Sequence, residues 1–384
     1  MSIISTNEEE QAYVGGQAVI EGVMMRSPRA LAVAVRKGNG SIIVREDVWV
    51  SLFERIKFLR WPFLRGSVVL IESLYNGIQA LNFSAQHAEI ESDSTNEALQ
   101  KTADTEEQHV SGSIYSESDV EEAEPAQSPL STAFTIGVSL LMAFGLFKGL
   151  PHFLTVLVDK LAGSGVNLSV DQFGFHALDG VFKLSIFVAY VSGISMIPEI
   201  RRVFQYHGAE HKSINAYEQG LELTLENARK QTTFHARCGT SFVLFVLVLS
   251  IFVFAAVFPF VPRIAENEYL NHVAMLAFKV PLMLPLAGLA YEINRYAARH
   301  PEQFWVQALV VPGALMQKIT TKEPDDEQLE IALSAMRAAI HAEDRYAAAS
   351  EQEARQLARS DQRTQVRVFR DFSEVPALAS EATR

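Results

Sequence analysis

Residues 241–262 read SFVLFVLVLSIFVFAAVFPFVP, a run of 22 residues without one charged side chain. At 1.5 Å per residue, a helix of this length is about 33 Å long, which is enough to cross the hydrocarbon core of a bilayer. Three further apolar runs lie near residues 130–150, 180–198 and 273–291. The sequence therefore predicts a mainly α-helical, polytopic membrane protein with about four transmembrane helices in a membrane domain at 129–324.

The charged residues are distributed unevenly around these runs. The chain has a formal net charge of −12, and residues 84–128 hold twelve of the acids and one lysine. This segment is rich in serine and almost free of aromatic residues, so we expect a disordered linker. The rest of the chain is nearly neutral, which argues against a basic surface for nucleic acid. Cys238 is the one cysteine, so an internal disulfide bond is impossible.

Lysine and arginine indicate how the chain is oriented in the membrane. They gather before the first run, between the second and third runs, and after the fourth, whereas the connections 151–179 and 263–272 each hold one. Because cytoplasmic loops carry the excess of lysine and arginine, both termini and the histidine-rich loop 199–240 are predicted to be cytoplasmic. The expected location is a cytoplasmic membrane, with the lipid bilayer as partner.

Three lysines lie in or beside the predicted spans, namely Lys148, Lys183 and Lys279. All three fall toward the outer ends of the spans, so their ammonium groups are expected to snorkel to the interface. No acidic residue lies well inside the four predicted spans, which argues against coupled ion transport.

The N-terminal segment 1–50 is predicted to be a small soluble β element. Residues 30–36 are rich in valine and alanine, the following Lys-Gly-Asn-Gly favours a tight turn, and residues 41–50 return as the second strand of a hairpin. Gly15 to Gly22 is interpreted as tight turns, with a glycine-rich phosphate loop as the weaker alternative. Glu21, which lies between Gly15-Gly16 and Gly22, is a candidate site residue.

Two further segments outside the spans are predicted to be helical. Residues 51–83 are apolar but carry a polar stripe of Glu72, Asn76 and Gln79. This pattern suits a helix in the membrane interface or one packed against other helices, and Glu72 is interpreted as the solvated edge of the stripe. Residues 325–384 are predicted to form a cytoplasmic amphipathic helix, with apolar side chains at helical spacing, and a frayed tail.

The segment before the 241–262 run carries the candidate chemistry. His207 and His211 are four residues apart, so on a helix both imidazoles can face one metal ion. Glu210 beside them can take a proton from water as a catalytic base. His207-x-x-Glu210-His211 is the inverted form of a zinc-protease signature. The segment is therefore predicted to hold zinc, with Glu210 as the catalytic residue.

At least one more ligand must come from elsewhere. Glu218 is excluded because seven residues of helix place it about 10.5 Å beyond His211, whereas zinc ligands lie about 2 Å from the ion. His235 and Cys238 are the candidates, since both directly precede the next span. Three protein ligands leave a position for water and hydrolysis, whereas four close the site. Arg237 beside Cys238 can instead favour a nucleophilic thiolate, which we rank below a cysteine ligand.

Four segments resemble one known family. Residues 15–26 (GGQAVIEGVMMR), 207–212 (HGAEHK), 235–241 (HARCGTS) and 312–324 (PGALMQKITTKEP) are similar, in this order, to the YqhQ-like family of uncharacterised bacterial membrane proteins, sometimes described as predicted metal-dependent enzymes. The resemblance covers about residues 15–340 apart from the linker, and it implies a bacterial cytoplasmic membrane protein. Two functions stay open: a zinc-dependent hydrolase, and a non-catalytic membrane scaffold or assembly factor with a structural metal or none.

Overall fold

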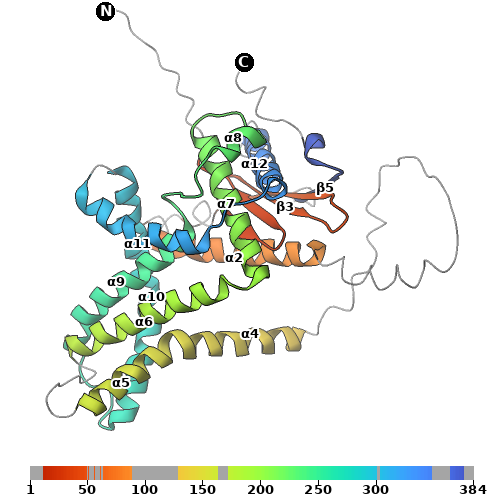
Figure 1. Ribbon diagram of the computed structural model, residues 1–384. Helices are drawn as coiled ribbons and strands as arrows, with labels where there is room; N and C mark the ends of the chain where they lie inside the picture. Colours follow the sequence, from red (N-terminus) through yellow and green to blue (C-terminus); the bar gives the residue numbers. More distant parts are fainter. Residues whose placement is uncertain are drawn as a thin grey trace, which may run out of the picture.

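A computed structural model describes residues 12–49, 51, 56, 61, 64–88, 129–162, 172–300, 303–347 and 364–375. A β-sheet and its covering helices lie above a group of long apolar helices (Figure 1). The strands are β1 (Gly15–Val19), β2 (Gly22–Arg26), β3 (Ala30–Arg36), β4 (Ile42–Val48) and β5 (Thr364–Phe369). The helices are α2 (Leu64–Ala88), α4 (Pro129–Phe144), the π-helix η3 (Gly145–Gly149), α5 (Leu150–Ala162), α6 (Phe173–Ile194), α7 (Pro198–Glu218), α8 (Leu225–Arg229), α9 (Gly239–Val257), the 3-10 helix η5 (Phe258–Phe260), α10 (Glu268–Arg299), α11 (Phe304–Thr320), α12 (Asp326–Ala347) and the 3-10 helix η7 (Phe372–Glu374).

The sheet is antiparallel and larger than the single hairpin predicted. That hairpin is confirmed as β3 and β4, whose connection contains Gly40 with φ of 84°. The glycine-rich segment before it forms a second hairpin, β1–β2, rather than isolated turns. The prediction of a frayed tail is wrong for residues 364–369, which form β5 along β4. Their hydrogen-bond partners lie more than three hundred residues earlier in the chain, so the local sequence does not reveal the strand.

Both faces of the sheet are buried, because successive strand residues point to opposite sides. One face packs on α7 and α12, and the other packs on Ala80 and Phe83 of α2. The predicted C-terminal amphipathic helix is confirmed as α12, whose Leu329, Leu333 and Met336 are buried against the sheet. The result is a three-layer unit built from both ends of the described chain. The cytoplasmic location of α12 stays a prediction.

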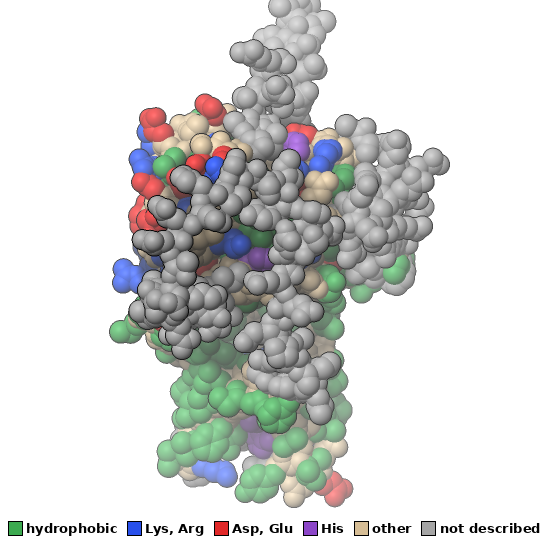
Figure 2. Space-filling model, turned by 90° about the vertical axis from the view of Figure 1, so that its right-hand side faces the viewer, with side chains coloured by type: hydrophobic (Ala, Val, Ile, Leu, Met, Phe, Trp, Pro, Cys, Tyr) green, Lys and Arg blue, Asp and Glu red, His purple; other side chains and the backbone are tan. Residues whose placement is uncertain are grey.

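Within the part of the chain that the structure describes, four helical segments are long and apolar enough to cross a membrane: Gly137–Leu161, Phe173–Ile194, Gly239–Phe260 and Tyr269–Tyr296. They confirm the expected number and indicate a membrane protein. The first span lies later than the predicted 130–150, because the helix continues through η3 into α5, and the second begins earlier than 180. Figure 2 shows hydrophobic side chains over the lower body and most of the charged ones above it. The cytoplasmic orientation stays a prediction.

The earlier start of the second span places Asp179 inside the membrane domain. Lys183 and Lys279 are 4% and 1% exposed, and their Nζ atoms lie 3.4 and 3.2 Å from Asp179 Oδ2. The snorkelling prediction is therefore wrong for these two lysines, because a buried carboxylate holds them inside the helix group. The prediction that no acidic residue lies well inside a span is wrong for the same reason.

Helix α2 lies between the sheet and the spans (Figure 1). Its Glu72 and Asn76 are 3% and 4% exposed, and Glu72 accepts hydrogen bonds from Arg26 and Ser51 at 3.3 and 2.9 Å. The interpretation of Glu72 as a solvated edge is wrong, because the polar stripe is buried. The exposed side chains of α2 include several large apolar ones: Leu70, Ile71, Leu74, Tyr75 and Ile78. An exposed apolar surface suits the membrane interface, which stays a prediction.

Two predicted segments have different boundaries in the structure. α2 extends through residues 84–88 of the predicted linker, and the remainder of that linker, residues 89–128, lies outside the described residues. The histidine-rich segment 199–240 is not a loop over most of its length, since α7 and α8 occupy much of it. The histidines thus lie on a rigid element.

Candidate metal centre

Helix α7 carries the predicted motif and runs beside the sheet, from the level of α2 up to α8 (Figure 1). It begins with Pro198 in its first turn, where a proline is well accommodated. Gly208 allows the segment after α11 to cross closely, since a Cβ at this position would lie 2.0 Å from the carbonyl oxygen of Lys322. His207 and His211 lie one turn apart on this helix and are 9% and 1% exposed.

Backbone carbonyl groups orient both imidazole rings. Nδ1 of His207 lies 2.8 Å from the carbonyl oxygen of Thr320, and Nδ1 of His211 lies 2.6 Å from that of Thr233. Because a carbonyl oxygen only accepts, each Nδ1 must donate a hydrogen, and in a neutral ring each Nε2 then carries a lone pair. A hydrogen bond from the second ring nitrogen to a carbonyl is the usual arrangement of metal-ligating histidines.

Cys238 completes a group of three possible ligands, which we call the metal centre. Its Sγ lies 3.2 Å from Nε2 of His207, and the donor atoms of His207, His211 and Cys238 all lie within 4.8 Å of one another. Cys238 is 5% exposed and occupies the N-cap of α9. Two neutral imidazoles and a thiolate form a donor set that suits zinc.

His235 lies beside the metal centre but has another partner. Its ring centroid is 5.6 Å from that of His211, and its Nε2 lies 3.4 Å from Oε2 of Glu218. Arg237 also pairs with Glu218. Burial raises the pKa of the Glu218 carboxyl, but His235 and Arg237 together hold this pKa below its usual range. The structure therefore places Cys238 beside the two histidines. It pairs His235 and Arg237 with Glu218, which helix geometry had excluded as a ligand.

Glu210 is buried against β1. A Cβ on Gly16 would lie 2.9 Å from its Oε1, and the backbone N–H of Ala18 donates to the carboxylate. Its Oε2 has no hydrogen-bond partner among the described residues. Burial raises the pKa of Glu210, although His207 and His235 lower it. A buried carboxylate with an unpartnered oxygen is suited to accepting a proton.

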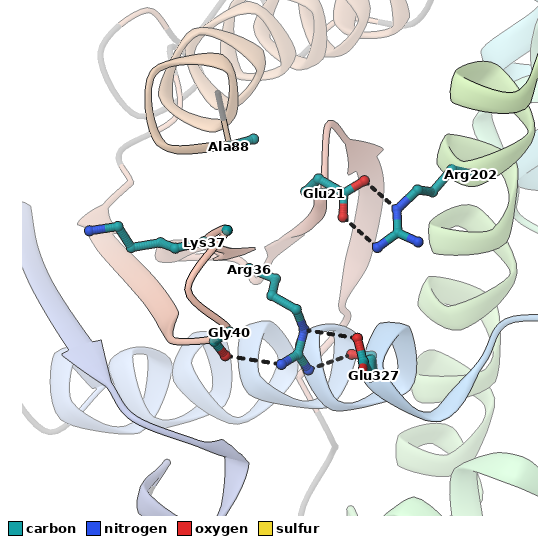
Figure 3. Close-up of a pocket in the computed structure, with 8 residues that line it drawn as sticks. Glu21, Arg36, Lys37, Gly40, Ala88, Arg202 and Glu327 are labelled. Atoms are coloured by element: carbon teal, nitrogen blue, oxygen red, sulfur yellow. Dashed lines mark hydrogen bonds and ion pairs between the residues drawn. The ribbon is translucent and has the colours of Figure 1, made fainter. Parts of the chain in front are cut away.

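Glu21 is not part of the metal centre but lines a pocket of about 450 Å³ (Figure 3). It occupies the β1–β2 turn with φ of 50°. Its carboxylate accepts two hydrogen bonds from Arg202 of α7, and the Tyr206 hydroxyl donates to it at 3.1 Å. Arg36 on the opposite side of the pocket pairs with Glu327 (Figure 3). Glu21 and Arg36 are therefore both paired with an opposite charge. The described contacts of Glu21 attach the β1–β2 hairpin to α7.

Sequence reasoning missed the groups that orient the site. Thr233 and Thr320 act through their backbone carbonyl oxygens, so no side-chain type signals their role. Gly16 and Gly208 act through the absence of a Cβ atom. In the sequence, the role of these two glycines is indicated by their position inside two of the motifs, because a glycine permits close approach of other atoms.

The chain is similar to known proteins over most of its length. Residues 61–342 match a family described as "Protein of unknown function (DUF1385)". The chain is also 33% identical over 336 residues to a protein of Bacillus subtilis (strain 168) described as "Uncharacterized protein YqhQ". That similarity covers 86% of this chain and 92% of the relative. No solved structure matches the chain.

Proposed function

We propose, from the premise that this chain belongs to the DUF1385 family of proteins of unknown function, that it is a membrane-bound, zinc-dependent hydrolase. His207, His211 and Cys238 are the proposed zinc ligands. The observation that carries the proposal is that both histidines donate through Nδ1 to carbonyl oxygens, while one ligand atom from each histidine and Cys238 Sγ all lie within 4.8 Å of one another. Preorganised lone pairs of this kind favour a cation.

The number of ligands favours hydrolysis. Zinc sites with three protein ligands keep a fourth position for water, whereas structural sites use four protein ligands. His235 would be the fourth, but its Nε2 faces Glu218. Bound zinc lowers the pKa of a water molecule to about 7. Glu210, with its unpartnered Oε2, is the proposed base that accepts the proton of that water.

Burial of the metal centre favours a second candidate, a structural metal in a non-catalytic scaffold. Its three ligand residues are all buried, and they join α7 to the start of α9. A metal held there would fix the sheet unit to the third span. In this alternative Glu210 has no chemical role.

Metal content tests the first step. Detergent-purified protein is expected to contain about one zinc per chain, and the His211→Ala variant none, because each lost ligand weakens a three-ligand site severely. His300→Ala, a histidine bonded to its own helix at the end of α10, is the matched control and should keep the metal. Equal zinc contents in wild type and His211→Ala would contradict the proposal.

Cobalt substitution separates the two candidates. Cobalt in the centre should show a sulfur charge-transfer band that disappears in Cys238→Ser. Azide should change the visible spectrum if a ligand position is open, and an unchanged spectrum favours the structural candidate. Glu210→Gln should keep the cobalt spectrum in both cases. In a hydrolase it should also abolish the cellular role of the protein, whereas a scaffold should tolerate it.

A further inference from the structure

Three lysine side chains converge inside the group of membrane-spanning helices. Lys148 comes from η3, Lys183 from α6 and Lys279 from α10. Their Nζ atoms lie 5.8, 6.0 and 5.9 Å from the ring centroid of Phe254 in α9. Four spans therefore contribute to one charged centre, which we call the lysine cluster.

The lysine cluster lies deep in the spans. Lys183 is near the middle of Phe173–Ile194, which places its backbone about 15 Å from either end of that helix. Lys148 has a similar position in Gly137–Leu161, and Lys279 lies about 15 Å from the Tyr269 end of the fourth span. At this depth an uncompensated charge is costly, so each charge requires a partner.

Positive charge exceeds negative charge in the cluster. Asp179 Oδ2 accepts from both Lys183 and Lys279, at 3.4 and 3.2 Å. The other acids of the four spans are Asp159, which is eleven residues beyond Lys148, and Glu292, which pairs with Arg65. The cluster therefore holds three ammonium groups and one carboxylate, which leaves two surplus positive charges when all are protonated.

Lys148 and His152 are the members with hydrogen-bonding capacity to spare. The polar contact of the Lys148 ammonium is a weak one, to Sδ of Met283 at 3.5 Å. His152, one turn later, is 7% exposed, and its Nε2 lies 2.9 Å from Nδ1 of His272. Its own Nδ1 has no hydrogen-bond partner among the described residues. In the tautomer in which His152 Nε2 accepts from Nδ1 of His272, its Nδ1 carries a hydrogen and is a second available donor, four residues after Lys148 in the same span.

The backbone beside Lys148 also departs from a regular helix. η3 is a π-helical turn between α4 and α5, and such turns are rare and frequently lie at functional sites. A Cβ on Gly145 or on Gly149 would meet nothing within 4 Å. There is open space beside this turn, so the irregularity is not imposed by close packing at its glycines.

We propose that the lysine cluster is an intramembrane binding site for a phosphate or phosphomonoester group. Such a group carries up to two negative charges and several acceptor oxygens, which match the two surplus ammonium charges and the donors at Lys148 and His152. The phosphate can come from a free anion or from the phosphomonoester headgroup of a lipid such as phosphatidic acid. The site is separate from the metal centre and does not depend on it.

Binding of radiolabelled inorganic phosphate to the detergent-purified full chain tests this site. We expect about one phosphate per chain, and binding at least about tenfold weaker in Lys148→Met, since hydrogen bonds to charged groups contribute about 1.5–3 kcal/mol. Lys160→Met, a lysine near the Tyr269 ring at the end of the same span, should bind like wild type. Lys148→Arg should retain binding, and zinc content should not change in any variant.

Phosphorus analysis of the same samples identifies the source of the group. One tightly held lipid phosphomonoester per chain, lost in Lys148→Met, would support the site with a lipid phosphate as ligand. If Lys148→Met does not fold, His152→Gln serves as the second variant, with the same expected loss. The proposal is overturned if neither inorganic phosphate nor lipid phosphate depends on Lys148 or His152.

Discussion

The metal centre and the lysine cluster are both buried groups of polar side chains, but they are organised in opposite ways. The metal centre fixes two imidazole rings through hydrogen bonds from Nδ1 to carbonyl oxygens, which leaves their Nε2 atoms to bind an ion. The lysine cluster contains more ammonium groups than carboxylates, and two of its three lysines share one oxygen of Asp179. One arrangement therefore favours a cation and the other an anion, although both lie in one chain.

Removal of the shared carboxylate should have the largest effect. Asp179→Asn leaves Lys183 and Lys279 without a counter-charge, and breaking a buried pair typically costs about 3–5 kcal/mol. Thermal unfolding in detergent should show a large fall in melting temperature, while the zinc content of the folded fraction stays constant. Asp179→Asn/Lys279→Met should recover part of the loss, because it removes one unpaired charge. An unchanged melting temperature for the single variant would show that Asp179 does not hold the cluster.

A smaller effect is expected where backbone packing shapes the metal centre. Gly208→Ala would place a Cβ 2.0 Å from the Lys322 carbonyl oxygen, so α7 must move away from the segment that orients His207. Overpacking of this kind costs about 1–3 kcal/mol, and zinc content should fall with it. Gly193→Ala, also a helical glycine but with nothing within 4 Å of the added Cβ, should leave both quantities unchanged. Full zinc occupancy in Gly208→Ala would contradict the prediction.

The smallest effect should distinguish the proposed base from the ligands. Gly16→Ala brings a Cβ to 2.9 Å from Glu210 Oε1, which the carboxylate can avoid by shifting, at a cost of about 1 kcal/mol. Zinc should stay bound, whereas the cellular role should weaken if Glu210 acts as a base. Gly15→Ala is the matched control, since its Cβ meets nothing within 4 Å. Equal phenotypes for the two variants would argue that the position of Glu210 is unimportant.

Elements with strong local patterns were predictable from the sequence. The four apolar runs, the Asn-Gly hairpin and the spacing of apolar residues in α12 each lie within one continuous segment. The pairing of His207 with His211 was predictable for the same reason, because one helical turn joins them. The second hairpin was hidden by its glycines, which suit isolated turns equally well.

Features that depend on distant residues were not predictable. Asp179 lies one residue before the predicted start of the second span, so an error of a few residues in that boundary assigned it to a connection. The choice between His235 and Cys238 depends on Glu218, which engages His235 from another part of α7. Hydropathy and spacing describe single segments, whereas these contacts join segments that meet only in the folded chain.

The sheet also has a consequence for the order in which the protein is made. Strands β1–β4 are synthesised before the four spans, whereas α12 and β5 come after them. At about 5–20 residues per second, the roughly 300 intervening residues take about 15–60 s to translate. During that interval one face of the sheet and the edge of β4 lack the partners that later cover them. An unpaired strand edge is open to wrong partners, so the first strands are exposed to mispairing until the C-terminal segment has been made.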